Sequence, residues 1–218
     1  MKLSAVMVFY NEENFLDRSL SCVKSFADEI VVFDSFSTDR SLSIAEKYGC
    51  KIYQHEFDNH RDQKNRAIEK CSGEWIILID ADEYFEDKLI NSIQGLMDNT
   101  DGIDAYGFPR KNYLDNSGPL GYPDFQIRLF KNYVRHFGHP FHHGAHDNAK
   151  KPVCLLNSGD IIHDKTNERQ DKQHRLYYSL RPQDYNFKAP RGSEDVVINE
   201  QAIKDPENVN VYKDYLGK

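Results

Sequence analysis

The chain of 218 residues contains no apolar run that approaches the roughly 20 residues of a transmembrane helix. The apolar stretch near the N-terminus is only about six residues long, which is shorter than the core of a secretory signal peptide. We therefore expect neither a membrane span nor a signal peptide. The expected location is cytoplasmic, with at most a peripheral association with membranes.

Positive charge is also scarce. The chain has 28 Lys and Arg against 35 Asp and Glu, a formal net charge of -7 and a pI of about 5.7. A protein that binds nucleic acid usually presents a strongly basic face. The composition therefore argues against nucleic acid as a partner.

Cysteine pairs of the CxxC type are absent. The four cysteines, Cys22, Cys50, Cys71 and Cys154, are scattered along the chain. We expect reduced thiols that fill small spaces in the core, as in a protein of a reducing compartment. The pattern does not indicate a disulfide framework.

Up to Asp98 the chain alternates between short apolar runs and amphipathic segments. Strands are predicted at 3–10, 29–34, 50–55 and 74–79, and helices at 13–25, 40–48, 62–71 and from Lys88 onward. Apolar strands that alternate with helices are typical of a mostly parallel sheet covered on both faces. The sequence therefore predicts an α/β fold with a mostly parallel central sheet flanked by helices.

The chemistry-bearing residues of this half cluster directly after its strands. The clusters are Asn11-Glu12, Asp34-Ser35, His55-Glu56 and Asp80-Ala81-Asp82. Ligands of parallel α/β sheets bind beyond the carboxyl ends of the strands, where the strand order reverses. We therefore place a ligand site at this edge of the sheet.

One apolar strand runs straight into negative charge, in the stretch WIILIDADEYF at 75–85. Asp80, Asp82 and Glu83 follow one another closely, and like charges repel most strongly where water is scarce. A positive counter-charge is therefore needed. It can be a metal ion, a helix N-terminus, or Lys and Arg side chains from elsewhere in the chain.

Two common explanations for a ligand at the edge of a parallel sheet lack their motifs. The G-x-G-x-x-G turn of a dinucleotide-binding fold is absent, since FYNEEN follows the first strand. The G-x-x-x-x-G-K-[ST] phosphate loop is absent as well. A third class, the nucleotide-sugar transferases, uses an Asp-x-Asp pair at the end of a buried strand, and DAD at 80–82 matches that pattern.

Longer stretches carry a family resemblance. They are VFYNEENFLDRSLSCVKSFADEIVVFDSFSTDRSLSIAEKYG, QKNRAIEKCSGEWIILIDADE and YPDFQIRLFK, which lie in order within 2–131. The chain resembles the inverting family 2 glycosyltransferases of the GT-A fold, and more narrowly the small lipopolysaccharide-core glycosyltransferases of bacteria. The resemblance implies metal-dependent transfer of a sugar from a nucleoside-diphosphate donor, expected to be a UDP-sugar, to a saccharide or glycan acceptor with inversion.

The resemblance also divides the chain. Residues 1–100 form the donor-binding half, residues 101–181 the acceptor side of the same GT-A domain, and residues 182–218 a C-terminal arm. In the second half, strands are predicted at 105–113 and 124–130 and a helix at 169–180.

Five residues are assigned to the donor nucleotide by the resemblance. Tyr10 and Glu12, after the first strand, are expected to contact the nucleoside. Asp34 is expected to contact the base and the ribose. Lys64 and Asn65 belong to QKNRA, a helix that lies over the nucleotide in the family.

The Asp-x-Asp motif is expected to hold Mn²⁺ or Mg²⁺ on the donor diphosphate, because both are hard cations that prefer oxygen ligands. Asp82 is assigned as the principal ligand and Asp80 as a contact to the ribose or to a metal-bound water, with Ala81 between them. His163, in IIHD, is assigned to the metal or the diphosphate. The alternative is a capped turn before the helix at Lys88, with acids favoured by the helix dipole.

Inversion requires a general base on the face of the sugar opposite the diphosphate. Asp124 is the first candidate; it is predicted to begin a strand after a Gly-x-Pro turn, with Gln126 and Arg128 on the same face. Glu83 is the reserve candidate because it adjoins the metal motif. The alternative for Asp124 is a residue that only caps the turn.

Histidines cluster in HPFHHGAH at 139–146. This stretch has neither a thiol nor an i, i+4 pair in a clear helix, so it does not indicate a zinc site. Roles in a loop or in the acceptor site are expected for these histidines.

Two other functions stay open. A nucleotidyltransferase also uses a metal and carboxylates at a sheet edge, although such enzymes usually begin with the Gly-rich loop that is missing here. A sugar-binding module with weak catalysis is the other, and Asp80, Asp82 and Asp124 argue against it. Hydrolysis of a nucleotide sugar would separate the enzyme from the module.

Overall fold

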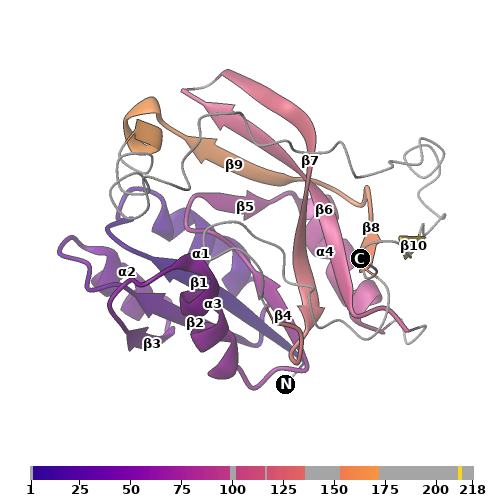
Figure 1. The fold of residues 1–218 in the computed structure, drawn as a ribbon, viewed down its shortest axis with the longest axis horizontal. Coiled ribbons are helices and arrows are strands. Elements are labelled where there is room, and N and C mark those ends of the chain that lie inside the picture. The colour runs from indigo at the N-terminus through magenta and orange to yellow at the C-terminus, as the bar shows by residue number, and fades with distance from the viewer. Residues whose placement is uncertain (1, 99–101, 116, 136–152, 172–210, 213–218) are drawn as a thin grey trace.

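The fold is described by a computed structural model for residues 2–98, 102–115, 117–135, 153–171 and 211–212 (Figure 1). Its helices are α1 (Leu16–Lys24), α2 (Ser41–Lys47), α3 (His60–Glu69) and α4 (Asp87–Asp98). Its strands are β1 (Leu3–Phe9), β2 (Glu29–Asp34), β3 (Lys51–Gln54), β4 (Trp75–Leu78), β5 (Glu83–Phe85), β6 (Ala105–Leu114), β7 (Ser117–Lys131), β8 (Val153–Leu155), β9 (Ile161–Lys165) and β10 (Val211–Tyr212).

The first half of the chain builds a parallel sheet. β1 pairs in parallel with β2 on one side and with β4 on the other, and β3 pairs in parallel with β2. A helix connects each of these strands to the next, so the chain returns in the same direction each time. The predicted alternation of strands and helices is confirmed. The strand order reverses beside β1, which is where a ligand site is expected.

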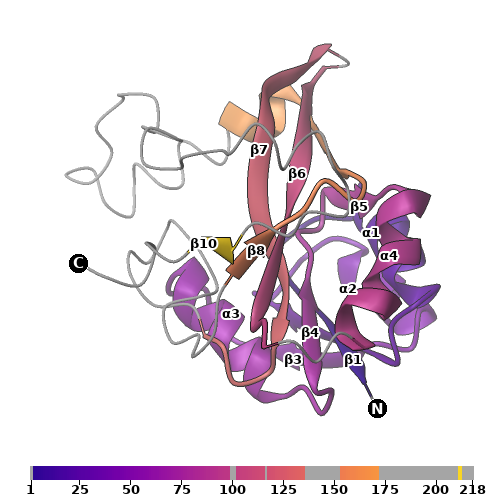
Figure 2. The same cartoon turned by 90° about the vertical axis from the view of Figure 1, so that its right-hand side faces the viewer.

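Helices cover both faces of this sheet (Figure 2). On one face, Ala5 and Met7 of β1 belong to a core that contains Leu20 of α1 and residues of α2 and α4. On the other face, Val6 lies in a core with Ile68 of α3. Because successive side chains of a strand point to opposite faces, one continuous apolar run serves both cores.

The second half extends the sheet with antiparallel strands. β7 pairs with β4, and β6 pairs with β7 as a long hairpin that reaches past the helices (Figure 2). β6 also pairs in parallel with β8 and β9, and β9 pairs with β5. The order among the described residues is β10-β8-β6-β7-β4-β1-β2-β3. The sheet is parallel through β4-β1-β2-β3, as expected for the first half of the chain, and mixed as a whole.

The strand that carries Asp124 differs from the prediction. β7 begins at Ser117, so Asp124 lies inside the strand, and the prediction that it begins one is wrong. Its register partner is Arg110 of β6. GPLGYP at 118–123 lies within β7, but its pairing with β6 is irregular: the register shifts on both sides of the Asn112–Leu120 pair, and Gly121 has a φ of +62°.

β5 is a strand that the sequence did not reveal. It has three residues, directly after the Asp-x-Asp motif, and it pairs Glu83 with His163 of β9. A strand this short is stabilised by its partner rather than by its own pattern. β5 therefore brings two candidate site residues together.

Several predicted features fall wholly or partly outside the described residues. The helix expected at 169–180 is described only as far as residue 171, where 167–171 are helical. The histidines at 139–146 lie outside. Of the C-terminal arm at 182–218, residues 211–212 are described and pair with β8.

The four cysteines are free thiols, as expected. Burial raises the pKa of Cys50 to about 11 and that of Cys71 to about 12, so these thiols stay protonated and unreactive at neutral pH. As for membranes, the described helices include none that is both long and apolar enough to cross a bilayer.

Glu29 joins the ends of neighbouring strands at the edge opposite the ligand site. Its carboxylate accepts hydrogen bonds from the Ser4 hydroxyl at 2.5 Å and from the Ser72 N–H at 2.6 Å, and it pairs with Lys51 at 2.5 Å. Burial by itself raises the pKa of Glu29, but these donors outweigh it and lower the pKa to about 2. The side chain is 4% exposed, so this charge contributes to folding.

Glu29→Gln tests that contribution. Because the folded-state pKa lies below the usual 4.5, the carboxylate stabilises the fold fully above that pH, and the effect is lost as pH falls toward about 2. We expect the variant to lose about 1–3 kcal/mol near neutral pH, and the loss to shrink on acidification. Urea denaturation at about pH 7 and about pH 3.5 measures both.

Glu74→Gln is the matched control. Its carboxylate is 65% exposed and pairs with Lys131, so we expect a loss below about 1 kcal/mol. A loss at Glu29 that does not change with pH would contradict the assigned role.

Candidate active site

The residues assigned to the donor converge at the carboxyl edge of the parallel strands. Tyr10 and Glu12 follow β1, Asp34 ends β2, and Asp80 and Asp82 follow β4. Because β1 lies between β2 and β4, the three loops are neighbours. The expectation that these clusters share one edge is confirmed. Tyr10 is 52% exposed there.

The loops after β1 and β2 are held together by side-chain hydrogen bonds. Asp34 is buried; both of its oxygens accept the Ser37 N–H at 3.0 Å, and Gln54 donates to Oδ2 at 2.9 Å. The Ser37 hydroxyl oxygen in turn accepts the Asn11 N–H at 2.8 Å. In this structure Asp34 therefore supports the loop that faces the site.

Asp80 is paired with two cationic side chains. Its Oδ1 lies 3.2 Å from Lys64 Nζ of α3, and its Oδ2 lies 2.8 Å from Arg128 Nη2 of β7. Burial by itself raises the pKa of Asp80, but Lys64, Arg128 and the nearby Arg110 hold it well below its usual value. The carboxylate is therefore charged at neutral pH. Asn65 is half-buried and follows Lys64 in α3.

Asp82 is buried and contacts the histidine that was predicted with it. Its Oδ2 lies 3.0 Å from Nε2 of His163, and Arg169 donates to the same oxygen. Although burial raises the pKa of Asp82, His163 and Arg169 lower it to about 2. Ala81, between the two acids, is buried, and its carbonyl accepts the Ser19 hydroxyl at 2.5 Å. The structure thus brings Asp82 and His163 together, while Asp80 faces other partners.

Glu12 shares Arg169 with Asp82. Arg169 Nη2 and Nε donate to the two oxygens of Glu12 at 2.5 and 3.1 Å, and the guanidinium lies 5.2 Å from the centre of the Phe15 ring. Burial raises the pKa of Glu12 in spite of this pairing. Arg169 therefore links the loop after β1 to the Asp-x-Asp turn.

Glu83 is fully buried between two guanidiniums. Its Oε1 lies 2.9 Å from Arg110 Nη1 and 2.5 Å from Arg128 Nη2, and its Oε2 accepts the Asp80 N–H at 3.2 Å. The side chain is 0% exposed. Its carboxylate therefore faces basic side chains and the Asp-x-Asp turn rather than open space.

Asp124 is held from several sides and remains 30% exposed. Its Oδ2 accepts from Arg110 Nη2 at 2.7 Å and from Asn112 Nδ2 at 3.0 Å, and its Oδ1 accepts from Gln126 at 2.7 Å. Burial raises the pKa of Asp124, but Arg110 and these donors bring it below the usual value. Asp124 is therefore ionised at neutral pH. The prediction that Gln126 shares its face is confirmed.

These contacts form one continuous network. In order, its members are Glu12, Arg169, Asp82, His163, Asn112, Asp124, Arg110, Glu83, Arg128, Asp80 and Lys64. In this structure, basic side chains from α3, β6, β7 and the segment after β9 supply the counter-charge that the clustered acids require. β5 separates the motif from the start of α4, so this helix end is not its cap.

Asp82 and His163 offer donor atoms that suit a divalent cation. Carboxylate oxygen is the ligand that Mg²⁺ and Mn²⁺ prefer, and neutral imidazole is a common metal ligand. In the part of the chain that the structure describes, no group of three or more His, Cys, Asp and Glu side chains could hold a metal by itself. The pair would supply two ligands and leave the remaining positions of such a cation to other oxygen ligands, as is usual for Mg²⁺.

Arg110, Asn112 and Arg169 belong to the network and were not identified from the sequence. There was only a weak indication in the sequence that Arg110 and Asn112 belong to the site: they are polar residues two positions apart in a predicted strand, so they share a face. No sequence pattern pointed to Arg169, because it lies 87 residues from its partner Asp82.

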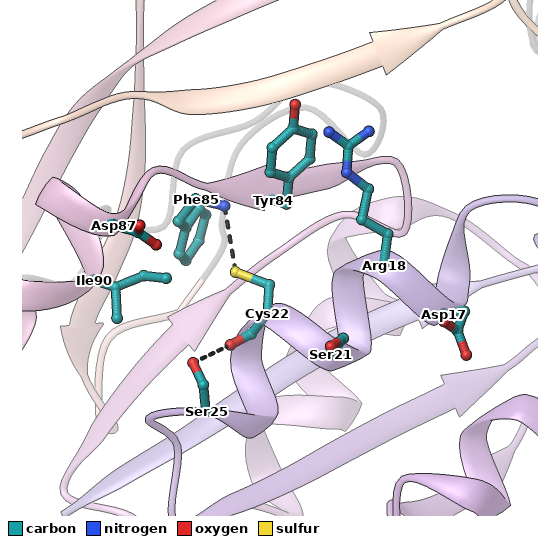
Figure 3. Close-up of a pocket in the computed structure, with 9 residues that line it drawn as sticks. All are labelled: Asp17, Arg18, Ser21, Cys22, Ser25, Tyr84, Phe85, Asp87 and Ile90. Atoms are coloured by element: carbon teal, nitrogen blue, oxygen red, sulfur yellow. Dashed lines mark hydrogen bonds between the residues drawn. The ribbon is translucent and has the colours of Figure 1, made fainter.

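A separate groove of about 470 Å³ lies between α1, β5 and α4 (Figure 3). Beside it, the Arg18 guanidinium stacks 3.3 Å above the Tyr84 ring and pairs with Asp164 at 2.6 Å. Tyr84 and Asp164 alternate with Glu83 and His163 along their strands, so they point away from the network. We therefore treat the groove as distinct from the candidate active site.

Residues 4–149, more than half of the chain, match the family described as Glycosyl transferase family 2. The chain therefore belongs to glycosyl transferase family 2. Its α/β architecture is the GT-A fold that the resemblance implied.

Two relatives illustrate how much of the chain is matched and at what sequence identity. An uncharacterized glycosyltransferase of Rickettsia bellii is 38% identical over 93 residues, which cover 43% of this chain and 32% of the relative. The lipopolysaccharide core biosynthesis glycosyltransferase LpsC of Rhizobium meliloti is 30% identical over 137 residues, covering 61% and 49%. The matched region thus spans about a third to a half of these relatives' lengths.

Two solved structures show the same fold. TarS of S. aureus in complex with UDP-GlcNAc has a TM-score of 0.59 at 17% identity, covering 83% of this chain and 66% of that one. Glucosyl-3-phosphoglycerate synthase of Mycobacterium tuberculosis, in complex with Mn²⁺, UDP and phosphoglyceric acid, has a TM-score of 0.56 at 14% identity, covering 82% and 78%. At these identities the likeness concerns the fold alone.

Glu83→Gln tests the centre of the network. The substitution keeps the shape of the side chain but leaves Arg110 and Arg128 without the carboxylate that they share. Removing one partner of a buried ion pair is strongly destabilising, so we expect a loss of about 3 kcal/mol in the free energy of unfolding, measured by urea denaturation.

Glu86→Gln is the control for this variant. Glu86 is close in sequence and pairs with Lys111, but its side chain is 36% exposed, so we expect a loss of about 1 kcal/mol or less. Equal losses for the two variants would show that Glu83 has no special weight in the fold.

Proposed function

We propose that this protein transfers a sugar from a UDP-sugar to a hydroxyl of a saccharide or glycan acceptor, with inversion at the anomeric carbon and with Mn²⁺ or Mg²⁺. The observation that carries the proposal is the contact between Asp82 and His163 at one part of the network, with the partly exposed Asp124 at another. Family membership supports the transferase class, and the named ligands of TarS and the phosphoglycerate synthase support the donor and the metal by analogy.

At the donor side, Asp82 and His163 would hold the cation, and Asp80 would contact the ribose or a metal-bound water. When bound, the cation supplies Lewis-acid stabilisation of the charge on the departing diphosphate. Lys64 and Arg169 lie beside these acids and would face the phosphate oxygens once the nucleotide is present.

The nucleoside would lie against the loops after β1 and β2. Tyr10 offers an exposed ring, Glu12 and Asp34 hold their loops, and Asn65 follows Lys64 on the helix that borders the site. Aromatic rings and ordered loop atoms of this kind are suited to a flat base and a ribose.

At the acceptor side, Asp124 acts as the general base. It takes the proton of the acceptor hydroxyl while that oxygen bonds to the anomeric carbon and the bond to the diphosphate breaks. Asp124 is favoured over Glu83 because it is 30% exposed, whereas Glu83 is 0% exposed and bonded to two guanidiniums. Arg110 keeps Asp124 ionised, which a base at neutral pH requires.

The two alternative functions predict different products. A nucleotidyltransferase would form a nucleotide sugar and release pyrophosphate, and a sugar-binding module would bind the nucleotide sugar without turning it over. The proposed transferase releases UDP and leaves the sugar with the opposite anomeric configuration, which NMR of the product distinguishes from both.

Asp82→Asn tests the donor site. Loss of a ligand should remove the enhancement of UDP binding by Mn²⁺, with UDP affinity in Mn²⁺ at least about tenfold weaker and metal-free affinity little changed. Calorimetric titration with and without Mn²⁺ measures both. Asp164→Asn, a carboxylate on the opposite face of β9 that pairs with Arg18, should behave as wild type. Unchanged metal dependence in Asp82→Asn would remove Asp82 from the metal site.

Asp124→Asn separates chemistry from binding. Loss of a base needed only as the acceptor attacks should lower kcat and kcat/KM together by about 10² to 10⁴, with the affinity for UDP without metal within about threefold of wild type. Transfer from a panel of UDP-sugars to simple saccharides, and UDP titration, are measured on the same variant. Asp115→Asn, an exposed carboxylate after β6, is the control. Transfer within tenfold of wild type would exclude Asp124 as the base, and lost UDP affinity would make it a donor-site residue.

A further inference from the structure

Asn112 of β6 occupies the middle of the network. Its Oδ1 lies 2.7 Å from Nδ1 of His163, and its Nδ2 lies 3.0 Å from Oδ2 of Asp124. The sheet register sets both contacts, because Asn112 is opposite His163 of β9, and Arg110, on the same face of β6, is opposite Asp124 of β7. A single amide therefore joins the donor side of the site to the acceptor side.

The orientation of this amide is determined by Asp124. An ionised carboxylate accepts hydrogen bonds and cannot donate them, so the amide nitrogen of Asn112 must face it. Asp124 is itself held by Arg110 at 2.7 and 2.9 Å. A longer contact from Nδ2 to the Leu120 carbonyl, at 3.5 Å, favours the same orientation. The carbonyl oxygen of Asn112 is thereby directed at His163.

The amide in turn determines which nitrogen of His163 is available at Asp82. A carbonyl oxygen only accepts, so Nδ1 of His163 carries a hydrogen. Nε2 faces the carboxylate of Asp82 at 3.0 Å, and a cation bound there would replace the hydrogen that Nε2 shares with Asp82. A histidine that binds a metal does so through one ring nitrogen, while the other donates to a partner that sets the tautomer and the ring orientation. Asn112 supplies that partner.

We propose that Asn112 is a positioning residue that directs Nε2 of His163 toward a divalent cation at Asp82, and that Asp124 sets the orientation of Asn112. This inference rests on the proposed function, because it concerns the same cation. Asp124 then acts at both sides of the site: directly on the acceptor, and through Asn112 on the histidine that holds the cation.

The test compares two substitutions at one position. Asn112→Leu removes both hydrogen bonds at similar size, whereas Asn112→Gln keeps an amide that can accept from Nδ1 of His163 and donate to Asp124. Mn²⁺ binding in the presence of UDP is followed through the EPR signal of free Mn²⁺. We expect Asn112→Leu to weaken Mn²⁺ binding about 10- to 100-fold, and Asn112→Gln to weaken it clearly less, by about threefold or under.

Two measurements separate positioning from loss of structure. UDP binding without metal should be within about threefold of wild type in Asn112→Leu, since the nucleoside loops do not contact Asn112. If the Asn112→Leu variant unfolds at a lower temperature than wild type, the Asn112→Ala variant is used in its place. Asn167→Leu, whose amide bonds Asp115 at the surface, is the control and should bind Mn²⁺ as wild type does.

The outcomes are distinct. Wild-type Mn²⁺ affinity in Asn112→Leu would overturn the inference and leave the proposed function standing. Equal weakening in the Leu and Gln variants would also overturn it, because the presence of the amide would then make no difference. Absence of UDP-dependent Mn²⁺ binding in the wild-type protein would overturn the metal-dependent function and this inference together.

Discussion

The buried carboxylate of Glu83, shared by Arg110 and Arg128, is the interaction on which the site depends. A buried charge is tolerated only where it is paired and hydrogen-bonded, so each guanidinium must remain in place. Arg110 extends from Glu83 to Asp124, and Arg128 extends from Glu83 to Asp80. The candidate base and the first acid of the metal motif are therefore positioned by one buried charge. β5, which carries Glu83, also pairs with the strand that carries His163.

The network also affects how the site could bind a charged ligand. Each acid of the Asp-x-Asp motif already has a basic neighbour: Lys64 and Arg128 for Asp80, and Arg169 for Asp82. A divalent cation and a nucleotide diphosphate would bring positive and negative charge side by side. Together they would change the net charge of the site less than either would alone. Under the proposed function, the basic side chains that neutralise these acids in the free protein would contact phosphate oxygens, and the cation would take their place at the carboxylate.

Most of the first half of the fold could be predicted from sequence, because its signals are local. The strands at β1, β2 and β4 are continuous apolar runs, and the helices between them carry apolar residues on one side. The second half was harder, because its strands depend on distant partners. GPLGYP indicates a turn by composition but lies within β7, where its pairing with β6 is irregular, and β5 is formed by pairing with β9. The position of Asp124 inside β7 follows from that pairing.

The sequence by itself determined the family, the parallel sheet and the edge at which Tyr10, Glu12, Asp34 and the Asp-x-Asp motif gather. The sheet and its edge follow from short-range pattern, and the family follows from the resemblance of long stretches that lie in order along the chain. Tertiary structure alone decided which acids are buried, which basic residue neutralises each of them, and that Asn112 stands between His163 and Asp124. These contacts join residues up to 157 positions apart, as between Glu12 and Arg169, and no local pattern encodes such a distance. They arise because the register of β5, β9, β6 and β7 places one side chain from each strand in a continuous row.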